Sequence, residues 1–181
     1  KIKPKMPWIH PIAPDLGGDG WIRKIKDRLA ASGLTEVYVY EFASRKLLEI
    51  FSETAKNVIE VENPTNPDTQ FLLPRPLYQY AAAATENLQR MESASIFGLA
   101  KGFRPAPKPT QEQPATETKY VVIVKAKKDK GRDSGAETFY SLKGVIDELL
   151  NSLGIADHWY DDALAPEEKR KAEIFHPYRR A

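Results

Sequence analysis

The stretch from Phe71 to Phe103 constrains the fold most, because it joins a proline-bounded helix to a strand. Pro74 and Pro76 are tolerated where a helix begins, since the first amides of a helix have no partner within it. The apolar positions that follow at helical spacing are Leu77, Ala81, Ala84 and Leu88. An alanine-rich face allows a second helix to approach closely, so the pattern fits an interface helix or an ordinary core helix. We predict a strand over 96–103 after a short polar break.

Helix and strand patterns alternate through the rest of the chain. The predicted elements are helices over 21–32 and 141–153 and strands over 35–42, 58–62 and 120–125. The segment 43–54 fits either a short helix or a turn leading into a strand. The residues expected to bound the two helices are Asp19, Gly33, Ser141 and Gly154. Interleaved elements with hairpin-like spacing favour an α+β fold, with an antiparallel sheet and helices on one side.

Two proline-rich stretches indicate the domain organisation. We expect residues 1–19 to be an N-terminal linker from a preceding domain, and residues 20–181 to form one module large enough to bury a core. The segment 104–118 holds four prolines and no apolar side chain larger than alanine or proline. It is therefore expected to be an exposed loop. The module itself is expected to be truncated at its C-terminal end.

Charge and composition exclude several function classes. The formal net charge is +2, from 27 basic and 25 acidic residues, which makes no strong electrostatic case for nucleic acid. The chain has no cysteine, which removes disulfides, thiolate metal sites and cysteine nucleophiles and fits a cytoplasmic location. No apolar run reaches the roughly 18 residues that a membrane span needs.

The motifs that carry chemistry are isolated, and we predict no catalytic residue and no metal site. His10 lies in the predicted linker, and His176 precedes a proline, where a structural hydrogen bond is the simpler interpretation. His158 lies in an acidic loop that has no regular metal-ligand spacing. Lys143 and Gly144 near a helix start fit an anion site, although Gly144 more simply allows close packing of a helix on a sheet.

Several segments, in this order, resemble the β subunit of phenylalanyl-tRNA synthetase, in its catalytic-like B6–B7 module. The first matching segments along the chain are WIRKIKDRLAASGLTEVYVYEF, the pair Asn63 and Pro64, and FLLPRPLYQYAAAATENLQR. SIFGLAKGF is similar to the family's "FEIGKVF" strand, and FYSLKGVIDELLNSLGI, which contains Lys143 and Gly144, is similar to its "FFDLKGDVEALLEALGL". FHPYRRA resembles "LHPGRSA" through His176, Pro177, Arg179 and Ala181. The chain departs from the family's pattern at Leu73, Gly98 and Tyr178, where the family has arginine, glutamate and glycine.

The resemblance implies a class II aminoacyl-tRNA synthetase-like antiparallel sheet flanked by helices, in a module that has lost its catalytic groups. The implied assembly is an (αβ)2 heterotetramer that attaches phenylalanine to tRNA with ATP and magnesium, while this module binds no cofactor. The implied partner is the α subunit, contacted through a motif-1-like helix within 71–103. We expect the residues facing it to be Pro74, Tyr78, Ala82, Thr85 and Gln89.

Two other functions remain open from the sequence. A stand-alone synthetase-like enzyme that activates a carboxylate with ATP would need arginines that converge on the triphosphate. The candidates near helix or strand ends are Arg75, Arg90, Arg104, Arg179 and Arg180. A direct RNA-binding module is the third interpretation, and the near-neutral charge argues against it.

Overall fold

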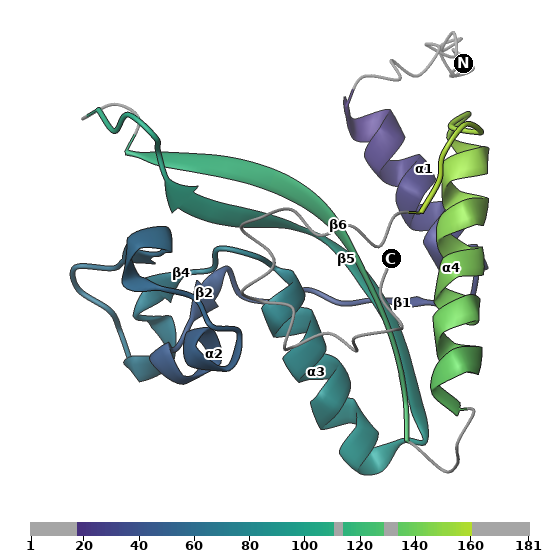
Figure 1. Ribbon diagram of the computed structural model, residues 1–181, viewed down its shortest axis with the longest axis horizontal. Coiled ribbons are helices and arrows are strands. Elements are labelled where there is room, and N and C mark those ends of the chain that lie inside the picture. Colours follow the sequence, from purple (N-terminus) through teal and green to yellow (C-terminus); the bar gives the residue numbers. More distant parts are fainter. Residues whose placement is uncertain (1–17, 111–113, 129–133, 161–181) are drawn as a thin grey trace, which may run out of the picture.

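A computed structural model describes residues 18–110, 114–128 and 134–160 of the chain. Its main sheet is built on a long antiparallel hairpin of β5 (Ser93–Pro105) and β6 (Ala115–Lys127), with Phe97 opposite Ile123. The short strand β1 (Thr35–Glu36) pairs with β5 in parallel, so the order is β1-β5-β6 (Figure 1). The expected purely antiparallel sheet is therefore mixed, because the chain crosses over between β1 and β5.

The hairpin strands extend into the segment that was expected to be an exposed loop. β5 continues to Pro105 and β6 starts at Ala115, and the amide of Ala106 donates to the carbonyl of Pro114 across 3.1 Å. The loop prediction over 104–118 is thus wrong at both ends. A β-hairpin can continue beyond its packed core, since each strand satisfies the backbone groups of the other without buried side chains.

Helices cover both faces of the main sheet, which corrects the expectation that they lie on one side. α1 (Gly18–Ala31) and α4 (Ser134–Ser152) lie together on one face, and α3 (Leu77–Arg90) lies on the other (Figure 1). Strand side chains alternate between faces, and both sets are apolar here. Phe97 packs with α1 and α4, whereas its neighbour Ile96 packs with α3. A hairpin that is apolar on both faces must be covered twice.

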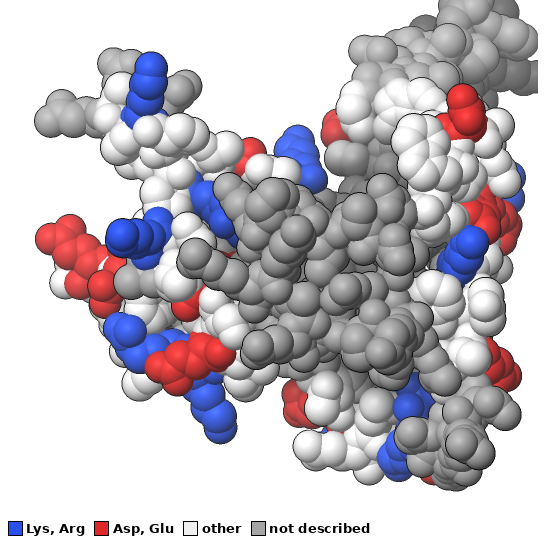
Figure 2. Space-filling view, viewed as in Figure 1, with Lys and Arg blue, Asp and Glu red and all other residues white. Residues whose placement is uncertain are grey.

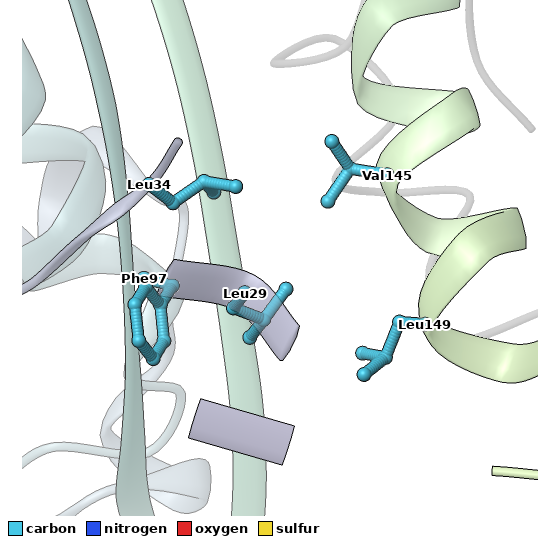
Figure 3. Packing of buried hydrophobic residues seen from close by; sticks show 5 residues of the cluster. All are labelled: Leu29, Leu34, Phe97, Val145 and Leu149. Carbon is cyan, nitrogen blue, oxygen red and sulfur yellow. The ribbon is translucent and has the colours of Figure 1, made fainter. Parts of the chain in front are cut away.

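The core under α1 and α4 comes from the apolar stripe that the sequence indicated in α4. Figure 3 shows Val145 and Leu149 pointing toward the side chains of Leu29, Leu34 and Phe97, and all five are buried. α4 starts seven residues before Ser141, so Ser141 does not cap it and instead accepts a hydrogen bond from Lys125 Nζ at 2.7 Å.

The predicted glycine ends of both helices are confirmed. Gly33 and Gly154 each have φ of 81°, the left-handed conformation that glycine adopts most easily. The amide of Leu34 then returns to the carbonyl of Leu29 at 3.2 Å, which closes α1. Asp19, however, lies inside the first turn of α1 rather than at its N-cap. Gly18 and Asp19 thus belong to α1, and the rest of the expected linker, 1–17, lies outside the described residues.

A second, smaller sheet stands beside α3. It has the antiparallel order β2-β4-β3, formed by β2 (Phe42–Ala43), β4 (Phe71–Leu72) and β3 (Ile59–Glu60). The ambiguous segment after β2 is a helix, α2 (Arg45–Ile50), followed later by the 3-10 helices η1 (Ala55–Asn57) and η2 (Pro67–Thr69). The single strand expected over 35–42 is therefore wrong, because its two ends pair in different sheets.

Two glycines of β5 allow α3 and the prolines that precede it to lie directly on the sheet. A Cβ on Gly98 would overlap the Tyr80 hydroxyl and lie 2.7 Å from the carbonyl oxygen of Val37. A Cβ on Gly102 would lie 2.7 Å from the carbonyl oxygen of Pro74. Glycine is therefore required at both positions for the observed contact between α3 and β5.

Candidate interaction surface

The outward face of α3 has mostly small or polar side chains and one charged side chain, Glu86. Ala82, Thr85 and Gln89 are exposed, whereas Ala84 is buried against the sheet. The Thr85 hydroxyl donates to the carbonyl oxygen of Ala81 at 2.8 Å, so its hydrogen bond is already made within the helix. Side chains this short allow the axis of a second helix to come near the lower limit of helix packing distances. Three of the five predicted contact residues thus lie on one open face.

The other two predicted contact residues, Pro74 and Tyr78, are buried within the chain, so the expected orientation of Tyr78 is wrong. The Tyr78 ring stacks on Phe51 with centroids 4.0 Å apart and an interplanar angle of 14°. Its side chain is only one of several that fill the space between the first turn of α3 and the small sheet. The start of α3 therefore serves the internal core, and the outer surface lies further along the helix.

A buried polar group lies where Tyr78 meets the small sheet. The Tyr78 hydroxyl donates to Glu53 Oε1, and the Glu53 side chain is fully buried. Arg104 Nη2 lies 3.6 Å from the same oxygen. Burial first, and then the hydrogen bond to Glu53, raise the pKa of Tyr78 well above its usual value, while the charges of Arg75 and Arg104 act in the opposite direction. The phenol is therefore a neutral donor at physiological pH.

The arginines proposed to hold a triphosphate do not converge in the described residues. Arg104 pairs with Glu53, and Arg90 is exposed in the last turn of α3. Arg75 lines an apolar groove of about 440 Å³ beside β6, together with Leu77, Val121 and Ile146. Arg179 and Arg180 lie outside the described residues. An arginine that neutralises a buried carboxylate has little charge left for a substrate.

In the described structure, the Lys143 side chain contacts an aromatic ring and Gly144 is exposed. Lys143 Nζ lies 4.3 Å from the centre of the Tyr160 ring, a cation–π contact. Gly144 is exposed, and a Cβ there would meet nothing within 4 Å. The prediction that Gly144 allows close helix-to-sheet packing is therefore wrong, because it lies on the solvent side of α4.

His158 folds back onto α4. Its Nε2 lies 2.9 Å from Asp147 Oδ1, and the Tyr160 hydroxyl donates to the same oxygen at 2.7 Å. These hydrogen bonds lower the pKa of Asp147, and desolvation with the Asp147 contact raises the pKa of Tyr160 to about 12. Within the described part of the chain, no group of three His, Asp or Glu side chains is arranged to hold a metal ion.

Two of the remaining motif residues lie in a connection between elements. Asn63 and Pro64 are exposed in the connection between β3 and η2. His10, His176, Pro177 and Arg179 lie outside the described residues.

Charges of both signs are mixed over the described part of the face in Figure 2. Lys101 pairs with Glu117 at 2.9 Å, and Lys127 pairs with Glu137 at 2.8 Å. This mixture is typical of a solvated protein surface rather than a nucleic-acid groove, where basic residues gather on one face. None of the described helices is both long enough and apolar enough to cross a membrane.

Comparison with known proteins decides the family. The family described as "Phenylalanyl tRNA synthetase beta chain CLM domain" matches residues 7–181, nearly the whole chain. The chain belongs to this family. Its resemblance to the β subunit, first carried by short motifs such as Asn63-Pro64, is thereby confirmed.

Named relatives of this CLM-domain chain are β subunits of the same ligase. The chain is 27% identical over 150 residues to a phenylalanine–tRNA ligase β subunit from Syntrophus aciditrophicus, a match that covers 78% of the chain and 18% of that protein. It is 22% identical over 137 residues to the β subunit from Dehalococcoides mccartyi, covering 74% of the chain and 17% of that protein. The chain thus spans less than a fifth of the length of these relatives.

The fold of the CLM-domain chain also occurs in a solved synthetase structure. It matches a pyrrolysyl tRNA synthetase from Desulfitobacterium hafniense with a TM-score of 0.54 at 12% identity. The match covers 77% of this chain and 47% of that one. At this identity the likeness establishes a shared fold, and the mixed α+β class predicted from the sequence is confirmed.

One exposed surface of this CLM-domain chain was not predicted from its sequence. Tyr38 and Tyr40, in the segment predicted to form one strand over 35–42, are 78% and 84% exposed. Val37 and Val39, which alternate with these tyrosines, are half-buried and pack against the core under α3. The alternation of valine and tyrosine was a signal for this arrangement, since a two-residue period is typical of a strand with one open face.

Proposed function

We propose that the chain is part of the β subunit of a cytoplasmic phenylalanine–tRNA ligase, where it holds the α subunit in place and does no chemistry itself. Membership of the CLM-domain family over residues 7–181 and the β subunits named among its relatives support this assignment. The assembly is an (αβ)2 heterotetramer that attaches phenylalanine to tRNA. The fold of the chain is of the class II synthetase type, in line with the fold that it shares with a pyrrolysyl tRNA synthetase.

The observation that carries the non-catalytic role is the internal use of groups that a synthetase would need for substrate. Arg104 faces the buried Glu53 carboxylate at 3.6 Å, and Arg75 adds its charge beside Tyr78. Apolar side chains fill both faces of the sheet centre, with Phe97 on one face and Ile96 on the other. ATP and magnesium are accordingly assigned to the α subunit.

The face assigned to the α subunit is the outer side of α3. Ala82, Thr85 and Gln89 are exposed on a helix whose opposite side is fixed to the sheet by Tyr80 and Ala84. A helix held rigidly in this way is preorganised for docking, so little conformational entropy is lost on association. Replacing Ala82 by glutamate inserts a charge and extra volume into the centre of this face without touching the core.

The test is to mix the chain with the phenylalanine–tRNA ligase α subunit of the same organism and to measure the mass of the complex by light scattering. We expect a stable complex, which Ala82→Glu weakens while the melting temperature of the chain alone is unchanged. A parallel assay measures ATP–pyrophosphate exchange. Exchange by the isolated chain would overturn the non-catalytic role, and absence of any complex would overturn the scaffold role.

A further inference from the structure

The outer end of the β5–β6 hairpin extends past the helices that cover its centre (Figure 1). We call the described residues 104–110 and 114–118 the hairpin arm. Its two strands stay paired, with Arg104 opposite Thr116 and the amide of Ala106 bonded to the carbonyl oxygen of Pro114 at 3.1 Å. Most of its side chains beyond Arg104 are exposed. The arm is therefore held together by its own pairing, and its direction depends on the contacts at its base.

A backbone hydrogen bond and an ion pair join the base of the arm to the neighbouring small sheet. The amide of Phe103 donates to the carbonyl oxygen of Leu73 at 2.9 Å. In the ion pair, Arg104 Nη2 lies 3.6 Å from Glu53 Oε1. Glu53 lies just before η1, and η1, β3 and β4 all contact β5. The base of the arm thus depends on a main-chain bond that many sequences can make and on an ion pair that needs these two side chains.

The turn that directs Glu53 into the core has an unusual backbone. After α2, the amide of Ser52 donates to the carbonyl oxygen of Glu49, and the amide of Glu53 donates to that of Leu48, both at 3.0 Å. Ser52 has a φ of 52°, the left-handed conformation for which a helix end normally has glycine. A serine in this conformation is strained, and such strain persists only where the surrounding structure maintains it. The Glu53 side chain that follows has no exposed surface.

The attraction between charges positions Arg104. A buried carboxylate is costly unless a cation and hydrogen bonds compensate it. The Tyr78 hydroxyl donates to Glu53 Oε1, and Arg104 supplies the positive charge. Arg104 Nη2 is buried and makes no hydrogen bond within the described residues, so at 3.6 Å it is held by charge rather than by a directional bond. A substitution that keeps the shape of Glu53 and removes its charge should therefore release Arg104.

We propose that the Glu53 carboxylate fixes the direction of the hairpin arm by holding Arg104 at its base, and that the arm turns about this base when the charge is lost. Gly102, whose backbone is the least restricted, lies two residues before Arg104. A fixed arm presents its exposed residues in one direction, so it loses less conformational entropy when it contacts another molecule. This device lies within the chain and is independent of the proposed function, which assigns α3 rather than the arm to the α subunit.

The test measures the position of the arm relative to α3 in the full chain. The sequence has no cysteine, so spin labels can be attached at Lys108→Cys in the arm and at Glu86→Cys on α3, both at exposed positions. Double electron–electron resonance then gives the distribution of distances between the two labels. We expect one narrow distribution, which Glu53→Gln broadens about twofold or more as the arm is released.

Glu117→Gln is the matched control. It makes the same chemical change and breaks the ion pair of Glu117 with Lys101, 2.9 Å long, on the exposed surface of the same hairpin. Surface ion pairs contribute little, so the distance distribution should stay narrow. Amide hydrogen exchange at Phe103, whose amide bonds to Leu73, should become about tenfold faster or more in Glu53→Gln and stay unchanged in Glu117→Gln.

A second variant separates release of the arm from general loss of stability. Glu53→Gln combined with Arg104→Met removes both charges, so no buried charge is left without a partner and urea unfolding should stay close to that of the unaltered chain. The distance distribution should still be broad. A narrow distribution in this double variant would show that the bond from Phe103 to Leu73 fixes the arm alone, and the proposal would be wrong. Equal broadening by Glu117→Gln would also overturn it, because any lost ion pair would then loosen the hairpin.

Discussion

Replacing Gly98 by alanine tests whether α3 is seated directly on β5. The new methyl group would overlap the Tyr80 hydroxyl and lie 2.7 Å from the carbonyl oxygen of Val37. Tyr80 is 1% exposed, so it has no free space to move into. Overpacking of this kind costs about 1–3 kcal/mol, and loss of the buried hydrogen bond from Tyr80 to Val37 adds about 1–3 kcal/mol. We expect the free energy of unfolding to fall by about 2–6 kcal/mol.

Urea unfolding followed by circular dichroism measures this change, and Gly144→Ala provides a control with the same chemistry. Gly144 lies within α4, and a Cβ there meets nothing within 4 Å. Alanine is favoured over glycine inside a helix, so this variant should be more stable by about 0.5–1 kcal/mol. The two substitutions therefore have opposite signs. Equal stability of Gly98→Ala and the unaltered chain would refute the close contact between α3 and β5.

Two further perturbations address the polar groups. Tyr78→Phe removes a donor to the buried Glu53 carboxylate and should lower the free energy of unfolding by about 1–3 kcal/mol. The same urea assay measures this change, and an unchanged free energy of unfolding would show that the hydroxyl is not needed. The pKa of Asp147 is lowered by His158 and Tyr160, so the stabilisation is present above the ordinary value of 3.8 and is lost as pH falls through the lowered pKa. Chemical shifts of His158 should report release from α4 only in that acidic range, and release near neutral pH would contradict the Asp147 contact.

The sequence predicts best those elements whose signals are local. Gly33 and Gly154 end α1 and α4 as expected, because a left-handed residue at a helix end has a strong glycine preference. The apolar stripe of α4 places Val145 and Leu149 correctly, since this helix contacts a single surface and one 3.6-residue period suffices.

Predictions fail where one element contacts two bodies. Tyr78 packs against the small sheet, while Tyr80 packs against the main sheet, on a different side of α3. A helix buried on two sides has no single apolar stripe, so periodicity assigned Tyr78 to the outer face. The segment 35–42 fails for a related reason, because its start pairs with β5 and its end pairs with β4. Pairing partners far apart in sequence leave no local pattern.

The candidate surfaces were predictable to different degrees. Ala82, Thr85 and Gln89 were expected on an open face from helical spacing together with the resemblance to the β subunit. Tyr38 and Tyr40 were missed because aromatic and β-branched residues indicate a buried strand when no partner is known. An aromatic side chain reserved for another subunit has the same composition signal as one that is buried within its own chain.

The Tyr80 hydroxyl connects α3, the helix proposed to contact the α subunit, to the segment that follows β1. It lies on α3 and donates to the carbonyl oxygen of Val37 at 2.8 Å, and burial raises the pKa of Tyr80, which keeps it a donor at neutral pH. Tyr80→Phe retains the ring and removes this bond, so stability should fall by about 1–3 kcal/mol. The segment that follows β1 loses its anchor to α3, however, because Val37 is then held from the α3 side by packing alone.

We therefore expect Tyr80→Phe to speed amide hydrogen exchange at Val37, whose amide bonds to Phe97 at 2.8 Å, and to weaken α-subunit binding more than its effect on stability explains. The matched control is Tyr140→Phe, which alters an exposed hydroxyl on α4. Unchanged exchange at Val37 would mean that β5 alone positions the segment that follows β1, independently of α3.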